Sequence, residues 1–274
     1  MHAMALVSPR GSIDYLCLPR FDSPSVFAAL LDDAEGGRFR IAPTRGGERV
    51  RQFYVPDTNI LLTRFLSVDG VAEVTDFMPT PEAQHAHRLV RIVETVRGEV
   101  TFALACEPRF DYARAAHRVA IDGNRATFAC EGPDGLTLRL HGGAALAATA
   151  TRGVEATFTL AAGERLAFVL EVVPEDAESV VAAPGYAERA FATTLRFWRH
   201  WMSRCRHDSR WPAALNRSAL ALKLLTSEPH GAIAAAATFG LPEGIKGERN
   251  WDYRYTWIRD GSLTASTLID LGYR

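Results

Sequence analysis

Four aromatic rings and four charged side chains fall within the eleven positions 250–260, in the sequence NWDYRYTWIRD. A regular core helix or strand separates apolar and charged residues onto opposite faces, whereas this stretch mixes them. The mixture suits a pyranose ring, whose faces carry apolar C–H groups and whose rim carries hydroxyls. Tyr253 and Trp257 can cover the faces, while Arg259 and Asp260 can hold pairs of hydroxyls through charge-assisted hydrogen bonds. The same side chains also suit a protein interface.

Each of these residues also has a purely structural interpretation. Asp260 precedes a predicted helix over 262–271, so its carboxylate could cap the free N–H groups of the first turn. Arg259 could pair with Asp252 or Glu248. The four rings alternate along the chain, and in an extended segment they would all face one side as core: Trp251, Tyr253, Tyr255 and Trp257.

The elements that must position this stretch begin with a long β region. Glycine-containing turn sequences such as Asp122-Gly123-Asn124 separate its apolar runs. Short strands at this spacing predict an antiparallel sandwich domain, which we place at residues 1–182. Apolar residues alternate with smaller or polar ones in four runs: 100–106, 136–140, 154–160 and 166–172.

After the β region the apolar period changes from two to about 3.6 residues. The spacing predicts an amphipathic helix over 186–206 and a second helix that opens at Trp211-Pro212, because proline is tolerated in a first turn. A glycine- and alanine-rich connection over 229–249 leads to the third helix, 262–271. Three one-sided helices cannot close a helical domain, so we expect an exposed apolar patch on the first and third, and a chain truncated at its C-terminus.

Composition and charge exclude several classes of function. The formal net charge is −1 and no block of basic residues is present, which disfavours nucleic acid and anionic membranes as partners. We expect a cytoplasmic protein, since no signal peptide and no apolar run of about 18 residues is visible. We expect neither a metal nor a cofactor, because the only close histidine pair is His85 and His87. Four cysteines without CxxC spacing fit reduced thiols: Cys17, Cys106, Cys130 and Cys205.

Three segments resemble glycoside hydrolase family 15, which includes glucoamylases, glucodextranases and bacterial trehalases. GERNWDYRYTWIRDGSLTASTLIDLGY, at 247–273, resembles the family's first active-site segment. GSIDYLCLPRFDSPSVFAALLD, at 11–32, is similar to the start of its trehalase-like N-terminal domain. SALALKLLTSEPHGAIAAAATFGLPE, at 218–243, resembles its first barrel helix and the loop that follows. The sequence departs from the family at Ala237, where a proline is usual, and at Lys246-Gly247, where the family has two glycines.

The resemblance implies the architecture of the whole chain. A mainly β, N-terminal super-β-sandwich is expected over 1–182 and a linker helix over 183–210. The opening helices of an (α/α)6 barrel are expected over 211–274. The segment FDSPSVFAALLD, at 21–32, favours the bacterial trehalase branch of the family.

The resemblance also implies inverting hydrolysis of α-glucosidic bonds, in trehalose or α-1,4-glucans. Arg259 and Asp260 would grip the outer hydroxyls of the terminal glucose, while Tyr253 and Trp257 would pack near its ring. Inversion needs two carboxyl groups, and the family carries both as glutamates on later barrel loops. These lie beyond Arg274, so we expect no catalytic residue in this chain and no activity from it alone.

A second hypothesis is a non-catalytic carbohydrate-binding or interaction module, in which the sandwich and the aromatic segment persist without hydrolysis. Under both hypotheses an α-glucoside is the expected partner, and formation of a homo-oligomer is left open. Hydrolysis requires a continuation of the chain with the two glutamates, whereas a module does not.

Overall fold

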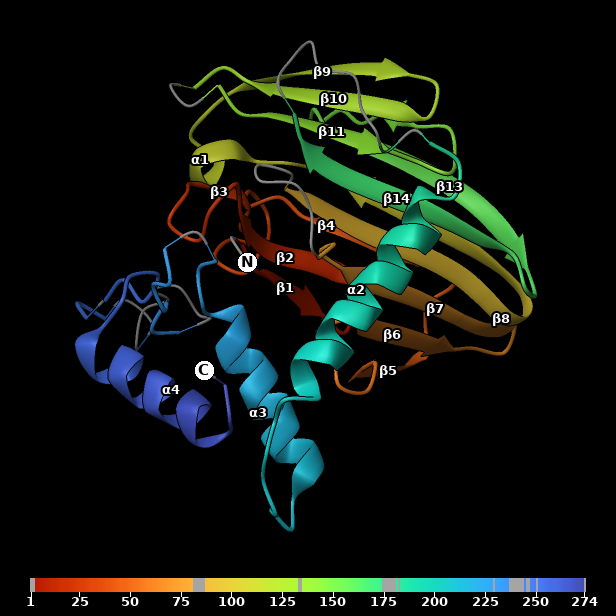
Figure 1. Ribbon diagram of the computed structural model, residues 1–274. Helices are drawn as coiled ribbons and strands as arrows, with labels where there is room; N and C mark the ends of the chain where they lie inside the picture. Colours follow the sequence, from red (N-terminus) through yellow and green to blue (C-terminus); the bar gives the residue numbers. More distant parts are fainter. Residues whose placement is uncertain are drawn as a thin grey trace.

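The computed structural model describes residues 3–80, 87–132, 135–173, 181, 183–228, 230–236, 244, 247–249 and 251–273. Antiparallel strands occupy most of the chain up to Val173, and three longer helices follow them (Figure 1). The strands are β1 (Ala5–Ser8), β2 (Ser12–Cys17), β3 (Ser25–Phe27), β4 (Phe39–Pro43), β5 (Arg49–Tyr54), β6 (Leu61–Leu66), β7 (Gly70–Phe77), β8 (Arg88–Cys106), β9 (His117–Asp122), β10 (Arg125–Cys130), β11 (Thr137–His141), β12 (Ala147–Ala148), β13 (Val154–Ala161) and β14 (Arg165–Val172). The four predicted runs are confirmed as β8, β11, β13 and β14.

Strand β8 is 19 residues long and belongs to two sets of strands. Its first half pairs with β7 and β14, and its second half pairs with β4 and β13. Gly98 lies between the halves with a φ of 79°, and a Cβ there would clash with the carbonyl oxygen of Asp69. This junction therefore requires glycine. One set continues through β6 to β5 and through β11 and β10 to β9, and the other through β2 to β1.

A single large apolar core receives side chains from both sets, as in a β-sandwich. The alternation in β13 shows why, because Val154, Ala156 and Leu160 are buried while the residues between them are mostly exposed. Phe158 of β13 stacks on Phe102 at 5.5 Å between ring centroids and meets Phe168 of β14 at 5.4 Å. Phenylalanines from both sets thus pack together.

A buried ion pair also ties the two sets together. Arg91 of β8 is fully buried, and its Nε lies 2.7 Å from Oδ1 of Asp76 in β7. The same guanidinium donates hydrogen bonds to two carbonyl oxygens of the other set of strands. One belongs to Phe39 in β4 (2.6 Å), and the other to Gly11 in the turn between β1 and β2 (2.9 Å). These bonds satisfy a charge that would be strongly destabilising if it were buried without partners.

Helix α2 (Tyr186–Met202) lies across the face formed by β6, β7, β8 and β14 (Figure 1). Its Trp198, Trp201 and Met202 are buried in a second apolar cluster with side chains of the sheet, including Val90 and Val169. The prediction that the apolar stripe of the first helix stays exposed is therefore wrong. That stripe has a partner, which is the outer face of the sheet.

Helices α3 (Pro212–Leu224) and α4 (Ile258–Asp270) follow, and Leu224 of α3 and Leu268 of α4 both pack against the second apolar cluster. Helix α3 begins at Pro212 as predicted, whereas α4 begins four residues earlier than predicted. Helix α4 does expose large apolar side chains, namely Ile258, Leu263 and Ile269. None of the helices in the described ranges is long and apolar enough to cross a membrane.

Candidate functional site

Residues 251–257 form a turn rather than an extended segment, so the one-sided row of four rings does not form. The N–H of Ala235 anchors the turn, because it bonds to the carbonyl oxygen of Tyr253 (2.9 Å). Within the turn Tyr253 and Trp257 stack face to face, with centroids 5.2 Å apart and planes at 15°. Trp251 meets Trp257 edge-on at 6.4 Å. The turn thus presents a compact aromatic group in which the two predicted rings are partners.

Arg259 and Asp260 lie in the first turn of α4 rather than before it. The Arg259 Nη2 is 3.1 Å from Oδ2 of Asp260, so the predicted pairing of Arg259 with Asp252 or Glu248 is wrong. The capping interpretation of Asp260 is also wrong, because no side-chain cap bond forms at this helix and the N-cap residue is Trp257. The side chain of Arg259 is 71% exposed, which leaves its N–H groups accessible to a ligand.

The structure adds an ion pair that sequence reasoning missed, between Asp252 and Arg254. The Arg254 fork contacts both carboxylate oxygens, with Nη2 2.7 Å from Oδ2 and Nε 3.0 Å from Oδ1. These bonds hold the pKa of Asp252 below its usual value. A carboxyl group with a lowered pKa is already charged near neutral pH, so Asp252 is a poor general acid. Two other acidic residues precede this turn in the sequence: Glu248 has an exposed side chain, and Glu243 lies outside the described residues.

Arg254 also reaches the β region. Its Nη1 lies 2.9 Å from the hydroxyl of Tyr112 and 3.5 Å from the carbonyl oxygen of Ser23. Tyr112 sits in α1 (Phe110–Ala113), a single turn between β8 and β9. The spacing of Asp252 and Arg254 is a local signal for their pairing, but Tyr112 is 142 positions away and the sequence carries no sign of this contact.

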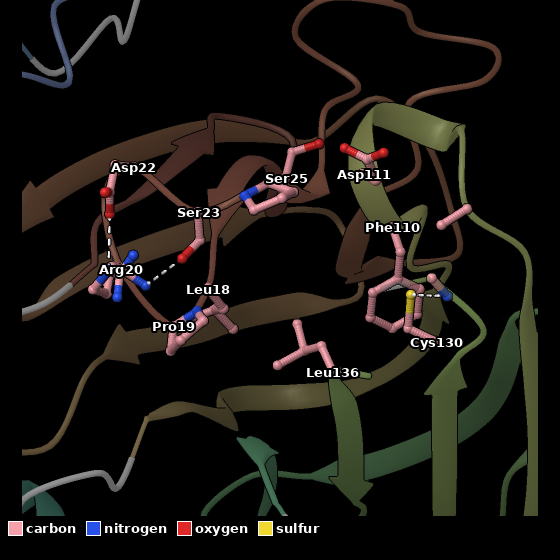
Figure 2. A pocket seen from close by; sticks show the side chains of 13 residues that line it. Leu18, Pro19, Arg20, Asp22, Ser23, Ser25, Phe110, Asp111, Cys130 and Leu136 are labelled. Atoms are coloured by element: carbon pink, nitrogen blue, oxygen red, sulfur yellow. Dashed lines mark hydrogen bonds and ion pairs between the residues drawn. The ribbon is translucent and has the colours of Figure 1, made fainter. Parts of the chain in front are cut away.

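Two hollows flank the loop 18–25 of the β region. One has a volume of about 430 Å³ and lies between this loop and side chains that include Phe110, Cys130 and Leu136 (Figure 2). None of the four predicted sugar-binding residues lines it. The other, of about 230 Å³, shares Arg20 and Asp22 with the first, and its lining includes Arg254, Tyr255 and Thr256. The turn 251–257 therefore borders the second hollow together with a loop of the β region.

Comparison with known protein families shows which families these two parts of the chain match. The model described as "Trehalase-like, N-terminal" matches residues 1–176, well over half of the chain. The model described as "Glycosyl hydrolases family 15" matches residues 212–274. The chain belongs to the trehalase-like N-terminal family, and its C-terminal segment matches glycoside hydrolase family 15. The stacked rings and the Arg259–Asp260 pair both lie in the part that the second family model matches.

Proteins with similar sequences include trehalases of archaea and bacteria. The chain is 36% identical over 284 residues to a trehalase of Thermoplasma acidophilum, covering 98% of this chain and 46% of that protein. It is 34% identical over 298 residues to a trehalase of Mycobacterium tuberculosis, covering 97% of this chain and 42% of that protein. The chain thus spans less than half the length of these curated relatives.

A solved structure of a bacterial glucoamylase complexed with acarbose has a similar fold. The TM-score is 0.67, and the match covers 96% of this chain and 45% of the glucoamylase. The sequences are 12% identical, so the likeness concerns the fold.

Proposed function

We propose that the chain is part of an inverting hydrolase of α-glucosidic bonds. In this proposal Tyr253, Trp257, Arg259 and Asp260 form part of the subsite for the terminal glucose. The observation that carries the proposal is the aromatic stack followed by an exposed Arg–Asp pair, within the segment matched by the family 15 model. Stacked rings suit the apolar faces of a sugar, and an accessible guanidinium next to a carboxylate suits neighbouring hydroxyls.

Trehalose is the substrate that we favour over α-1,4-glucans. Trehalases match nearly the whole chain at 34–36% sequence identity, whereas the glucoamylase matches 96% of it at 12% identity. Both kinds of substrate present a non-reducing α-glucosyl unit, so the same four residues could hold either. The choice between them would depend on groups that contact the other half of the substrate.

The proposal assigns no catalytic carboxyl pair to the described residues. We assign the pair of glutamates to family regions that this chain does not match, and we expect the chain to be inactive without them. Helices α3 and α4 would open an (α/α)6 barrel over 211–274, after a sandwich over 1–182 and a linker helix over 183–210. The exposed Ile258 and Leu263 support this, since they would face other barrel helices.

The test is glucose release from trehalose and from maltose, by the 274-residue chain and by the same chain extended along its reading frame. Hydrolysis by the extended chain alone is expected, with inversion of the anomeric configuration detected by NMR. Hydrolysis by the shorter chain would overturn the assignment of the catalytic pair. Sugar binding without hydrolysis in both forms would favour the alternative, a carbohydrate-binding module. Faster hydrolysis of maltose than of trehalose would overturn the choice of substrate.

A further inference from the structure

We propose that Arg254 and Tyr112 are positioning residues for the aromatic stack, acting through a clasp between the β region and the turn 251–257. The clasp consists of Asp252, Arg254, Tyr112 and Ser23. The inference rests on the proposed function in so far as the stack is taken to bind glucose. It concerns residues that do not themselves touch the sugar.

The first link joins Arg254 to Asp252. Three side-chain contacts of 2.7 to 3.1 Å and one backbone N–H bond of 3.0 Å connect them, so a single geometry satisfies the pair. The side chain of Arg254 is 18% exposed and that of Asp252 is 35% exposed, so water competes only partly for these groups. Bidentate pairing of this kind fixes direction as well as distance.

The second link joins Asp252 to the stack. The carbonyl oxygen of Asp252 accepts a hydrogen bond from Nε1 of Trp257 at 3.3 Å. Trp257 in turn lies against Tyr253. A displacement of the Asp252 backbone would therefore move the indole ring and change the face that the stack offers to a sugar.

The third link joins Arg254 to a rigidly held hydroxyl in the β region. Asp111, Tyr112 and Ala113 have φ values of 51°, 55° and 64°, three consecutive non-glycine residues in the left-handed region. Such conformations are costly and persist only where neighbours enforce them, as happens at functional sites. Here the Tyr112 N–H donates to Oγ of Ser25 (3.1 Å), and the Tyr112 side chain packs against a buried cluster that includes Tyr15 and Cys17. The side chain that meets Arg254 is thus held both by its backbone and by its packing.

Through the clasp the β region would help to orient the turn 251–257. Backbone bonds to Ala235 and Ala236 hold the turn from one side, and Arg254 holds it from the β region. Loss of the Tyr112 hydroxyl would leave the first set of bonds intact and leave Arg254 only its longer contact with the carbonyl oxygen of Ser23, at 3.5 Å. The stack would then keep its residues but lose its fixed orientation.

The experiment compares near-ultraviolet circular dichroism of the 274-residue chain and its variants. Trp257→Phe defines the part of the signal that comes from the stack. Tyr112→Phe and Arg254→Gln should each lose most of that part. Arg254→Lys should not restore it, because an ammonium lacks the two-pronged geometry of a guanidinium. Tyr54→Phe, which removes a hydroxyl from the exposed strand β5, is the matched control and should keep the signal.

Far-ultraviolet spectra and thermal midpoints show whether each variant is folded. If Arg254→Gln does not fold, the test of the proposal rests on Tyr112→Phe. This variant removes only one oxygen atom, so it is expected to fold. An unchanged stack signal in folded Tyr112→Phe overturns the proposal. If both single variants fold, the double variant should lose no more signal than Arg254→Gln alone, because in this proposal the Tyr112 hydroxyl acts on the stack only through Arg254. Additive losses would also overturn it.

Kinetics give the functional readout in the extended, active polypeptide. Misplacement of a binding group by about 1 Å can cost up to about 100-fold, so Tyr112→Phe should lower kcat/KM by about tenfold or more. Wild-type kcat/KM in Tyr112→Phe would overturn the positioning role even if the spectrum changes. If the wild type hydrolyses neither trehalose nor maltose, the proposed function fails, and the dichroism experiment still decides whether the clasp orients the stack.

Discussion

The β region and helix α4 place their large apolar side chains in opposite surroundings. Phe102 and Phe168 are fully buried between the two sets of strands, whereas Ile258 and Leu263 of α4 are 87% and 64% exposed. A side chain of this size gains about 1.5–3 kcal/mol on burial, which the core residues obtain from their own chain. The exposed residues can obtain it only from a further partner.

The two regions differ in the same way in their Arg–Asp pairs. Arg91 and Asp76 are 0% and 3% exposed and have four protein hydrogen bonds between them and nearby carbonyl groups. Arg259 and Asp260 are 71% and 31% exposed and contact each other by one side of the guanidinium. The same two residue types thus stabilise the fold in one region and remain open to a ligand in the other.

The largest expected effect comes from breaking the buried pair. Arg91→Met leaves the charge of Asp76 buried without its partner and should lower the free energy of unfolding by about 3–5 kcal/mol. The matched change Arg259→Met, at the exposed pair, should cost about 0–1 kcal/mol. Urea denaturation of both variants measures the difference. Equal losses of unfolding free energy in the two variants would show that the difference in burial between the two pairs does not affect stability.

A smaller effect should appear as a dependence of stability on pH in the β region. His117 is buried against Phe110, and its Nε2 is 2.8 Å from the carbonyl oxygen of Arg152. Burial lowers the pKa of His117 in the folded state. The unfolded chain then binds the proton more readily, so stability is full above about pH 6.5 and is lost as pH falls through the folded pKa.

The slope for one proton cannot exceed about 1.4 kcal/mol per pH unit. His117→Gln should flatten the curve of unfolding free energy between pH 7 and pH 5, values chosen to bracket the ordinary histidine pKa of about 6.5. The same change at exposed His207 serves as the control and should leave the curve as in the wild type. A slope that survives in His117→Gln would place its origin elsewhere.

The strained turn α1 offers a stabilising substitution of about 0.5–1 kcal/mol. Ala113 has a φ of 64° and an exposed side chain. Ala113→Gly should relieve left-handed strain of about 1–2 kcal/mol, offset in part by the greater freedom of glycine in the unfolded chain. Thermal unfolding measures the net change. Destabilisation would mean that the methyl group of Ala113 makes a contact that outweighs the strain.

The smallest effect on stability is expected at α4. Ile258→Ser removes an exposed apolar side chain, so the free energy of unfolding should change by about 0.5 kcal/mol or less. Binding of a hydrophobic dye should nevertheless fall, because Ile258 is one of the large apolar side chains that α4 exposes. Ser203→Ala, at an exposed position outside α4, is the control. Dye binding equal to the wild type in Ile258→Ser would show that α4 is covered in solution.

The sequence predicted the β region well because burial there follows a period of two. The runs around Phe102, Leu138, Phe158 and Phe168 became strands for that reason. Helix α3 was placed by a proline, which has few acceptable positions in a helix. The start of α4 was missed, because Ile258, Arg259 and Asp260 were assigned to the binding segment rather than to its first turn.

The sequence predicted which residues belong to the candidate site, but it did not predict the contacts between them. Tyr253 and Trp257 were grouped correctly, but their stacking depends on a turn that the alternating rings did not indicate. The bond from Arg254 to Tyr112 joins positions that are distant in the sequence, and only the folded chain brings them together. A single sequence contains no local pattern for such a contact. The assignment of the four residues to glucose binding stays a prediction.

Strand β8 has a consequence for how the β region comes apart. Because one strand forms the hydrogen-bonded ladder of both sets, neither set can open at its centre without disrupting the other. The two halves should therefore exchange their amide hydrogens in a single cooperative event, with the slowest rates in the buried halves near Val93 and Phe102 and faster exchange at the exposed junction around Gly98. Because β8 is shared, the β region should unfold as one unit, although its strands form two separately hydrogen-bonded sets.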